Sequence, residues 1–203
     1  MQLSFLQRHP IFKDVLSISV FIVSVLVGTL IINSFIFRTF NVLGPSMEET
    51  LHTGDRLIVN RLPVTWAQLQ NKQYVPERGQ IIVFKNPRYS TGTGEEFIVK
   101  RVIAFPGERV TVKDGVLTVY NAAHPEGFHP DDAQKNDPGS HPGSYSSGDV
   151  DTVVDDGTLF VAGDHRIGSF SFDSRSGLGL IPYYDVIGPV GLRIWPLDKI
   201  RFF

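Results

Sequence analysis

Ser46 is the first residue whose setting suggests chemistry. It follows a Gly44-Pro45 bend and precedes Met47, within the stretch NVLGPSMEETL of residues 41–51. A serine hydroxyl is a poor nucleophile until a neighbouring base removes its proton. The chain contains no cysteine, which excludes a thiol nucleophile, disulfides and thiolate zinc sites. Ser46 can therefore act only if another segment supplies a base.

Lys100 is the candidate base, because it interrupts an apolar segment with the pattern of a β-strand, EFIVKRVIA of residues 96–104. On a strand the face of Lys100 would also present Ile98, Val102 and Ala104, and the opposite face would present Phe97, Val99, Arg101 and Ile103. Burial on such a face lowers the pKa of a lysine from its usual value of about 10.4, and a neutral amine can accept a proton. On spacing alone two simpler interpretations stay open: Lys100 reaches solvent or pairs with Glu95 or Glu96, and Ser46 is an ordinary turn residue.

The segment that precedes Ser46 is expected to anchor the protein in a membrane. Residues 15–37 contain no charged side chain, and about 23 residues suffice to cross a hydrocarbon core of about 30 Å. A cleavable signal peptide would have a shorter apolar region and a small-x-small cleavage site, whereas this run ends in bulky residues. Arg8 and Lys13 precede it and Arg38 follows it, which favours a cytoplasmic segment 1–14 and an extracytoplasmic remainder.

Residues 38–203 are expected to form one mainly β extracytoplasmic domain. Short apolar runs bounded by turn residues predict strands near 56–60, 80–84, 96–104, 110–120, 158–162 and 178–203, with one short helix near 66–69. Residues 110–120 would form a β-hairpin with its turn at Asp114-Gly115. Residues 121–150 are rich in Gly, Pro, His, Ser and Asp, which predicts a long flexible insertion that faces water. The formal charge of −2 argues against a nucleic-acid partner.

Four separated blocks resemble bacterial type I signal peptidases, the membrane-anchored serine proteases that remove signal peptides from exported proteins. The blocks are GPSMEETL at 44–51, GDRLIVN at 54–60, KRVIAFPGERV at 100–110 and GDHR…SFDSR at 163–175. They occur in the order typical of the family, after a single apolar span. The resemblance covers nearly the whole chain outside 121–157.

The resemblance implies a role for each matching residue. Ser46 would be the nucleophile, Lys100 the general base, and the backbone around Ser46 and Gly44 the binding site of the oxyanion. Ser171 would orient the lysine, and the residues that support the site would be Met47, Asp164, Arg166, Asp173 and Arg175. The resemblance also implies no metal or cofactor, and substrates that are signal peptides with Ala-x-Ala-like cleavage sites at the bilayer surface.

Three positions depart from the family pattern. Gly44 stands where some members have a serine hydroxyl that helps to bind the oxyanion. Glu49 replaces a proline, which loosens the backbone after the nucleophile. The last block contains two extra residues, so that Ser169 is an alternative to Ser171. Two rivals stay open: a Ser/Lys protease with another substrate and, because of Glu49 and the irregular last block, a surface-anchored β-domain that binds partners through a degenerate site.

Overall fold

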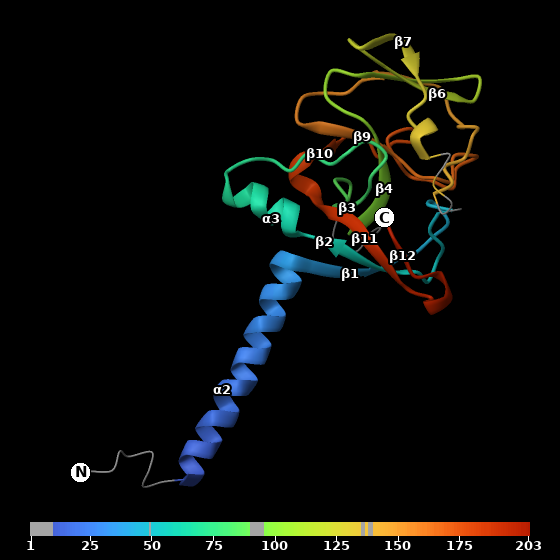
Figure 1. Cartoon of the computed structure of the whole chain (residues 1–203). Coiled ribbons are helices and arrows are strands. Elements are labelled where there is room, and N and C mark those ends of the chain that lie inside the picture. The colour runs from blue at the N-terminus through green and yellow to red at the C-terminus, as the bar shows by residue number, and fades with distance from the viewer. Residues whose placement is uncertain (1–9, 49, 90–95, 135–136, 138–139) are drawn as a thin grey trace.

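The computed structural model describes residues 10–48, 50–89, 96–134, 137 and 140–203. One long helix, α2 (Pro10–Ile31), projects from a β-rich domain and continues as a π-helical turn, η1 (Ile32–Ile36) (Figure 1). Residues 11–36 form a candidate membrane span of 26 residues, and its most apolar stretch has a mean hydropathy of 2.8 and no buried part. The mainly β fold with one N-terminal apolar helix confirms the predicted fold class. The helix begins five residues before the predicted boundary at Val15, because Pro10 is compatible with a first helical position and Lys13 and Asp14 continue the helix.

The larger sheet has eight strands in the order β1-β2-β11-β3-β4-β9-β10, with β12 also paired to β11. Its strands are β1 (Phe37–Asn41), β2 (Arg56–Asn60), β3 (Ile81–Lys85), β4 (Phe97–Ala104), β9 (Thr158–Ala162), β10 (Ile181–Pro182), β11 (Val186–Trp195) and β12 (Arg201–Phe202). Short helical elements connect or follow them: α3 (Leu62–Leu69), η3 (Tyr183–Asp185) and η4 (Leu197–Lys199). All of these pairs are antiparallel, and β11 and β9 bring distant segments of the chain beside β2, β3 and β4.

The smaller sheet has the order β7-β6-β5-β8 and lies at the end of the domain far from α2 (Figure 1). Its strands are β5 (Arg109–Lys113), β6 (Val116–Asn121), β7 (His124–Phe128) and β8 (Val150–Val153). The turn between β5 and β6 is Asp114-Gly115, and both residues have positive φ angles, 50° and 79°. These angles are typical of a tight hairpin turn, as the sequence predicts.

The side chains of β4 point alternately into two separate clusters of the hydrophobic core. Ile98 and Val102 pack into one buried cluster with Phe84. Phe97 and Val99 pack against a second cluster that contains Met47. The strand therefore lies between two layers of apolar side chains, and Lys100 projects from it at a position where its side chain is 3% exposed.

Residues 121–150 contain more ordered contacts than their composition indicates. Besides β7 and the start of β8, they include the short helix η2 (Asp132–Gln134) and two buried serines, Ser140 and Ser146. Asp131 forms an ion pair with the buried Arg166 of the last sequence block. These contacts differ from the expectation of a segment that faces water throughout. Phe128 and Val150 pack against the core of the smaller sheet, and polar side chains supply the other contacts described here.

Candidate active site

The loop after β1 fixes the position of Ser46. Val42 exchanges backbone hydrogen bonds with the segment before β2, donating to Asp55 O at 2.8 Å and accepting from Gly54 N at 3.0 Å. Gly44 has a φ of +80°, a left-handed conformation that glycine adopts without steric cost. Met47 is fully buried and anchors the far side of the bend. The half-buried Ser46 is thereby held between a glycine turn and a core residue.

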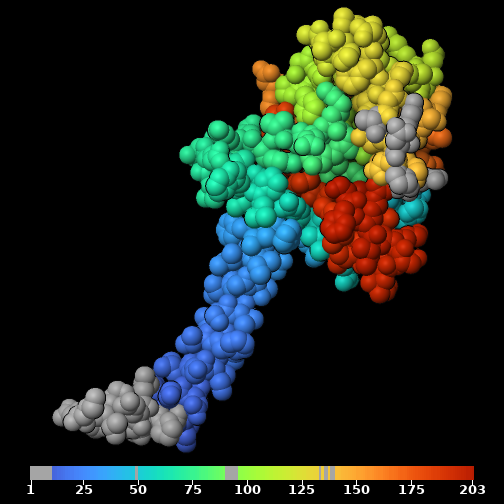
Figure 2. Space-filling model, in the orientation of Figure 1, coloured from blue at the N-terminus to red at the C-terminus, as the bar shows by residue number. Residues whose placement is uncertain are grey.

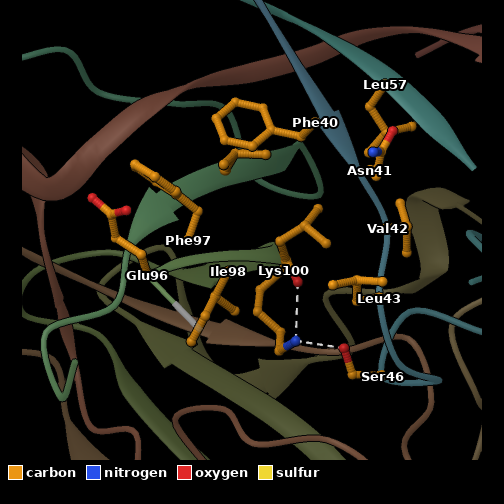
Figure 3. A pocket seen from close by; sticks show the side chains of 12 residues that line it. Phe40, Asn41, Val42, Leu43, Ser46, Leu57, Glu96, Phe97, Ile98 and Lys100 are labelled. Atoms are coloured by element: carbon orange, nitrogen blue, oxygen red, sulfur yellow. Dashed lines mark hydrogen bonds between the residues drawn. The ribbon is translucent and has the colours of Figure 1, made fainter. Parts of the chain in front are cut away.

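The structure brings Ser46 and Lys100 together. The Nζ atom of Lys100 lies 2.7 Å from Ser46 Oγ and 3.0 Å from the carbonyl oxygen of Val99 (Figure 3). A separation of 2.7 Å is a short hydrogen bond, well within the range at which a proton can transfer. With 3% of its surface exposed, Lys100 does not reach solvent.

Two hollows meet at this pair. The first, of about 300 Å³, opens between β1 and the start of β4 and is mainly apolar (Figure 3). Its lining is Phe40, Asn41, Val42, Leu43, Ser46, Leu57, Val83, Glu96, Phe97, Ile98, Val99 and Lys100. The second, of about 460 Å³, is lined by Gly44, Pro45, Asn86, Arg88, Phe170 and Phe172 together with Leu43, Ser46, Ile98 and Lys100. Ser46 and Lys100 therefore lie on the boundary of a groove with space on both sides.

Ser171, the preferred of the two candidate serines, is 3% exposed, whereas Ser169 is exposed to solvent. The Ser171 hydroxyl donates to Asp173 Oδ2 at 2.6 Å, and Arg175 Nη2 donates to the same oxygen at 2.7 Å. Burial of Asp173 opposes its ionisation. The hydrogen bonds from Arg175, Ser171 and the Gly163 N–H outweigh that cost and hold the pKa of Asp173 below its usual value.

Gly163 joins this group to the nucleophile loop. A Cβ atom at Gly163 would lie 2.2 Å from Ser171 Oγ and 2.2 Å from the carbonyl oxygen of Ser46, closer than real contacts allow. The next residues continue the contact, because His165 N donates to Ser46 O at 3.2 Å and His165 Nδ1 lies 3.2 Å from Pro45 O. The last sequence block is thus packed directly against the back of the Ser46 bend.

Residues 14–195 match the family described as signal peptidase, peptidase S26. The chain belongs to this family. It is 33% identical over 170 residues to signal peptidase I of Bacillus caldolyticus, covering 83% of this chain and 85% of that protein. It is 30% identical over 206 residues to signal peptidase IB of Staphylococcus aureus (strain MRSA252), covering 94% of each. A crystal structure of a signal peptidase I from Enterococcus faecalis V583 aligns with 28% identity and a TM-score of 0.40 over 57% of this chain and 96% of that one.

The family match over residues 14–195 confirms the resemblance predicted from the four blocks. Within the last block, Asp164 and Arg166 each have a partner from another segment of the chain. Asp164 pairs with Arg101, which donates from Nε at 2.8 Å and from Nη2 at 2.5 Å, and Arg166 donates to both carboxylate oxygens of Asp131 at 2.7 and 2.8 Å. Asp173 and Arg175 are the pair that forms within the block.

Sequence reasoning missed the residues that surround Asp164. Arg101 also donates to the carbonyl of Gly79 and to the hydroxyl of Ser140, and Thr50 Oγ1 donates to Asp164 Oδ2. Thr50 is four residues after the nucleophile, so this buried cluster holds the end of the Ser46 bend. The alternation of β4 placed Arg101 on an apolar face, and that was the one available signal. Glu49, the other departure noted in the sequence, lies outside the described residues.

Proposed function

We propose that this chain is a membrane-anchored signal peptidase that cleaves the signal peptides of exported preproteins, with Ser46 as nucleophile and Lys100 as general base. The observation that supports the proposal most strongly is the 2.7 Å contact between Lys100 Nζ and Ser46 Oγ, made by a lysine that is 3% exposed. Burial disfavours a charged amine in general, and only a neutral amine can remove the serine proton.

In this mechanism Ser46 Oγ attacks the scissile carbonyl carbon while Lys100 Nζ takes the hydroxyl proton. The tetrahedral intermediate collapses as Lys100 returns the proton to the leaving amine, which breaks the peptide bond and leaves an ester on Ser46. A water molecule then attacks the ester carbonyl while Lys100 Nζ takes one of its protons. As the bond to Ser46 Oγ breaks, Lys100 returns that proton to Oγ, which releases the carboxylic acid and restores both the serine hydroxyl and the neutral amine. The same amine therefore acts in both halves of the reaction, as in other nucleophile–base pairs.

The oxyanion needs hydrogen-bond donors at the bend. The backbone N–H of Ser46 has no acceptor within the described part of the chain and remains available for a ligand. A missing donor of this kind typically costs about 3–4 kcal/mol of barrier. Gly44 offers no hydroxyl, so its contribution would be the left-handed turn that presents the Ser46 N–H.

Two unpaired strand edges are suited to an extended substrate. β4 pairs with β3 from Phe97 onward but with β9 only from Arg101 onward, and β1 pairs with β2 alone among the described strands. Both edges border the apolar hollow of Figure 3. An extended peptide adds to such edges through its backbone, and small alternate side chains would fit the hollow. This arrangement supports Ala-x-Ala-like cleavage sites.

The supporting residues have positioning roles in this proposal. Ser171 would orient Lys100 from its place against the Ser46 bend, and the pair of Asp173 and Arg175 would fix Ser171. Asp164 and Arg166 would hold the backbone of the last block, and Met47 would anchor the bend in the core. Helix α2 would span the bilayer, with residues 1–14 in the cytoplasm and the β-rich domain outside.

The test is cleavage of a purified preprotein by the full chain in detergent or vesicles. We expect Ser46→Ala to abolish cleavage, while the control Ser144→Ala, an exposed serine in the 121–150 segment, leaves it unchanged. Full cleavage by Ser46→Ala would exclude the Ser/Lys mechanism. A wild-type chain that binds the preprotein without cutting it would favour the surface-anchored binding domain, and cleavage of other peptides alone would favour a protease with a different substrate.

A further inference from the structure

Helix α3 (Leu62–Leu69) has an apolar face that the fold leaves uncovered. Leu62, Trp66 and Leu69 are 47%, 65% and 74% exposed, and their spacing of four and three residues places them on one side of the helix. Val64, on the other side, is 5% exposed and packs toward the domain. The helix therefore packs against the domain through Val64, and its large apolar side chains face away from the domain.

This face adjoins the end of the membrane span. The backbone N–H of Arg61 donates to the carbonyl of Ile36 at 2.8 Å, and Thr65 Oγ1 donates to the carbonyl of Phe35 at 2.8 Å. Figure 1 shows α3 beside the upper end of α2, and in Figure 2 the surface of α3 continues directly from that end. The position of α3 relative to the span is therefore fixed by hydrogen bonds.

The length of the span places this junction at the surface of a bilayer. A helix of 26 residues is about 39 Å long at 1.5 Å per residue, whereas a hydrocarbon core is about 30 Å thick. The last turn of the span therefore reaches the headgroup region, where tryptophan is favoured because its ring is apolar and its N–H is polar. Trp66 lies at that level.

Two arginines at the same junction match the charge of lipid phosphates. Within the described residues, neither Arg38 nor Arg61 has an acidic partner. The Nε of Arg61 is buried and has no hydrogen-bond partner among them. Burial, and after it the nearby positive charge of Arg38, lowers the pKa of Arg61. An anionic group beside the two arginines would offset their repulsion and favour the charged form of both.

We infer that α3 is an interfacial helix, which binds the outer leaflet through Leu62, Trp66 and Leu69 while Arg38 and Arg61 contact lipid phosphates. The inference rests on the proposed membrane span but not on the chemistry of Ser46 and Lys100. With α2 and α3 both attached to the bilayer, the domain would have a fixed orientation, and the groove at Ser46 a fixed height above the membrane. A substrate that is itself held in the bilayer would then meet the groove in one orientation.

Fluorescence of the full chain in vesicles tests the contact directly. The chain has two tryptophans, so Trp195→Phe leaves Trp66 as the single reporter. In vesicles of phosphatidylcholine and phosphatidylglycerol we expect lipids brominated near the headgroup to quench Trp66 more strongly than lipids brominated at the chain ends. Quenching of Trp66 by aqueous iodide, with none by either lipid, would overturn the inference. Retention of the protein in alkali-washed vesicles shows independently whether α2 is embedded.

The consequence for catalysis needs two substrates and a matched control. For Leu62→Gln/Trp66→Gln/Leu69→Gln we expect kcat/KM to fall about tenfold on a preprotein embedded in vesicles and to stay unchanged on a short soluble peptide. The control, Val116→Gln/Val153→Gln, removes exposed apolar residues from the small sheet far from α2 and should affect neither substrate. Equal losses on both substrates would mean that α3 supports the fold, and no loss on either would contradict the orienting role. A wild-type chain inactive on both would instead refute the proposed peptidase.

The arginines have their own test. In the Trp195→Phe background, quenching of Trp66 by headgroup-brominated lipid should increase when phosphatidylglycerol is added to phosphatidylcholine vesicles, because an anionic surface attracts both guanidinium groups. Addition of Arg61→Gln to that background should reduce the increase. An increase identical with and without Arg61→Gln would exclude Arg61 from the lipid contact.

Discussion

Lys100 and Arg101 are neighbours on β4, each is 3% exposed, and yet they have opposite surroundings. Lys100 contacts a hydroxyl and a carbonyl, those of Ser46 and Val99, beside an apolar hollow. Arg101 contacts the carboxylate of Asp164 through two nitrogens. Burial alone would lower the pKa of Arg101, but the hydrogen bond and charge of Asp164 outweigh it and raise that pKa.

The difference shows two ways of placing a cation inside a protein. A permanent charge needs a permanent counter-charge, and Arg101 has one together with hydrogen bonds to a carbonyl and a hydroxyl. Lys100, the proposed base, needs surroundings in which its neutral form is stable, and its contacts with a hydroxyl and a carbonyl are compatible with a neutral amine. Because adjacent residues of a strand face opposite sides, β4 keeps the two settings apart within one residue step.

The largest expected effect comes from changing Lys100. Lys100→Arg should lower kcat by about 10²–10⁴-fold, the usual contribution of a general base, because arginine keeps its proton at neutral pH. Lys100→Met should be equally inactive but should melt close to the wild-type temperature, since it replaces a buried amine by an apolar chain of similar length. Single-turnover cleavage and calorimetry measure the two effects. Appreciable activity in either variant would contradict the role of a neutral amine.

Substitution of the neighbouring residue by methionine, Arg101→Met, should instead lower the stability of the fold. Arg101→Met leaves the carboxylate of Asp164 buried without its cation, and removal of one partner from a buried pair typically costs about 3–5 kcal/mol. We therefore expect a large fall in the free energy of unfolding, measured by urea denaturation. A second variant, Arg101→Met/Asp164→Leu, should recover part of it. If Arg101→Met were as stable as Lys100→Met, the distinction between the two positions would be wrong.

The sequence predicts the surroundings of Lys100 much better than those of Arg101. Alternation along 96–104 was enough to put Lys100 on an apolar face, and the family motif supplied Ser46 as its partner. The partners of Arg101 could not be found in that way, since Gly79, Ser140 and Asp164 come from three separate segments and none has a periodic pattern. Local pattern predicts which face a residue occupies, whereas partners across a fold depend on its topology.

The segment 121–150 shows the same limit. Its composition is typical of a solvated loop, yet Asp131 is the counter-charge of Arg166 and Ser140 contacts Arg101. Apolar periodicity, the main signal in a sequence, is absent where a segment is attached by polar side chains. The overall β fold, the long apolar helix and the hairpin at Asp114-Gly115 are predictable because each depends on short-range pattern.

Asp131→Asn tests the attachment of that segment and should have an intermediate effect. It leaves the guanidinium of Arg166, whose side chain is fully buried, with an amide in place of a carboxylate. The side chain of Asp131 is 19% exposed, so water can replace part of the interaction and the expected loss is about 1–3 kcal/mol. The control is Asp149→Asn, an exposed aspartate of the same segment. An unfolding free energy equal to that of the control would show that the ion pair contributes nothing to stability.

Ser171→Ala should have the smallest effect, and its pH dependence separates positioning from packing. The Ser171 hydroxyl donates to Asp173, whose pKa is lowered in the folded protein, so the bond stabilises the ionised form. Such a contribution is present above the usual pKa of aspartate, about 3.9, and is lost as the pH falls through the lowered value. We therefore expect Ser171→Ala to be about 1 kcal/mol less stable than wild type at neutral pH, with a smaller difference in acid. Ser169→Ala should match wild type at every pH. A Ser171 deficit that stays constant or grows in acid would contradict the hydrogen bond to the carboxylate, and a fall in kcat at neutral pH would support the proposed orientation of Lys100.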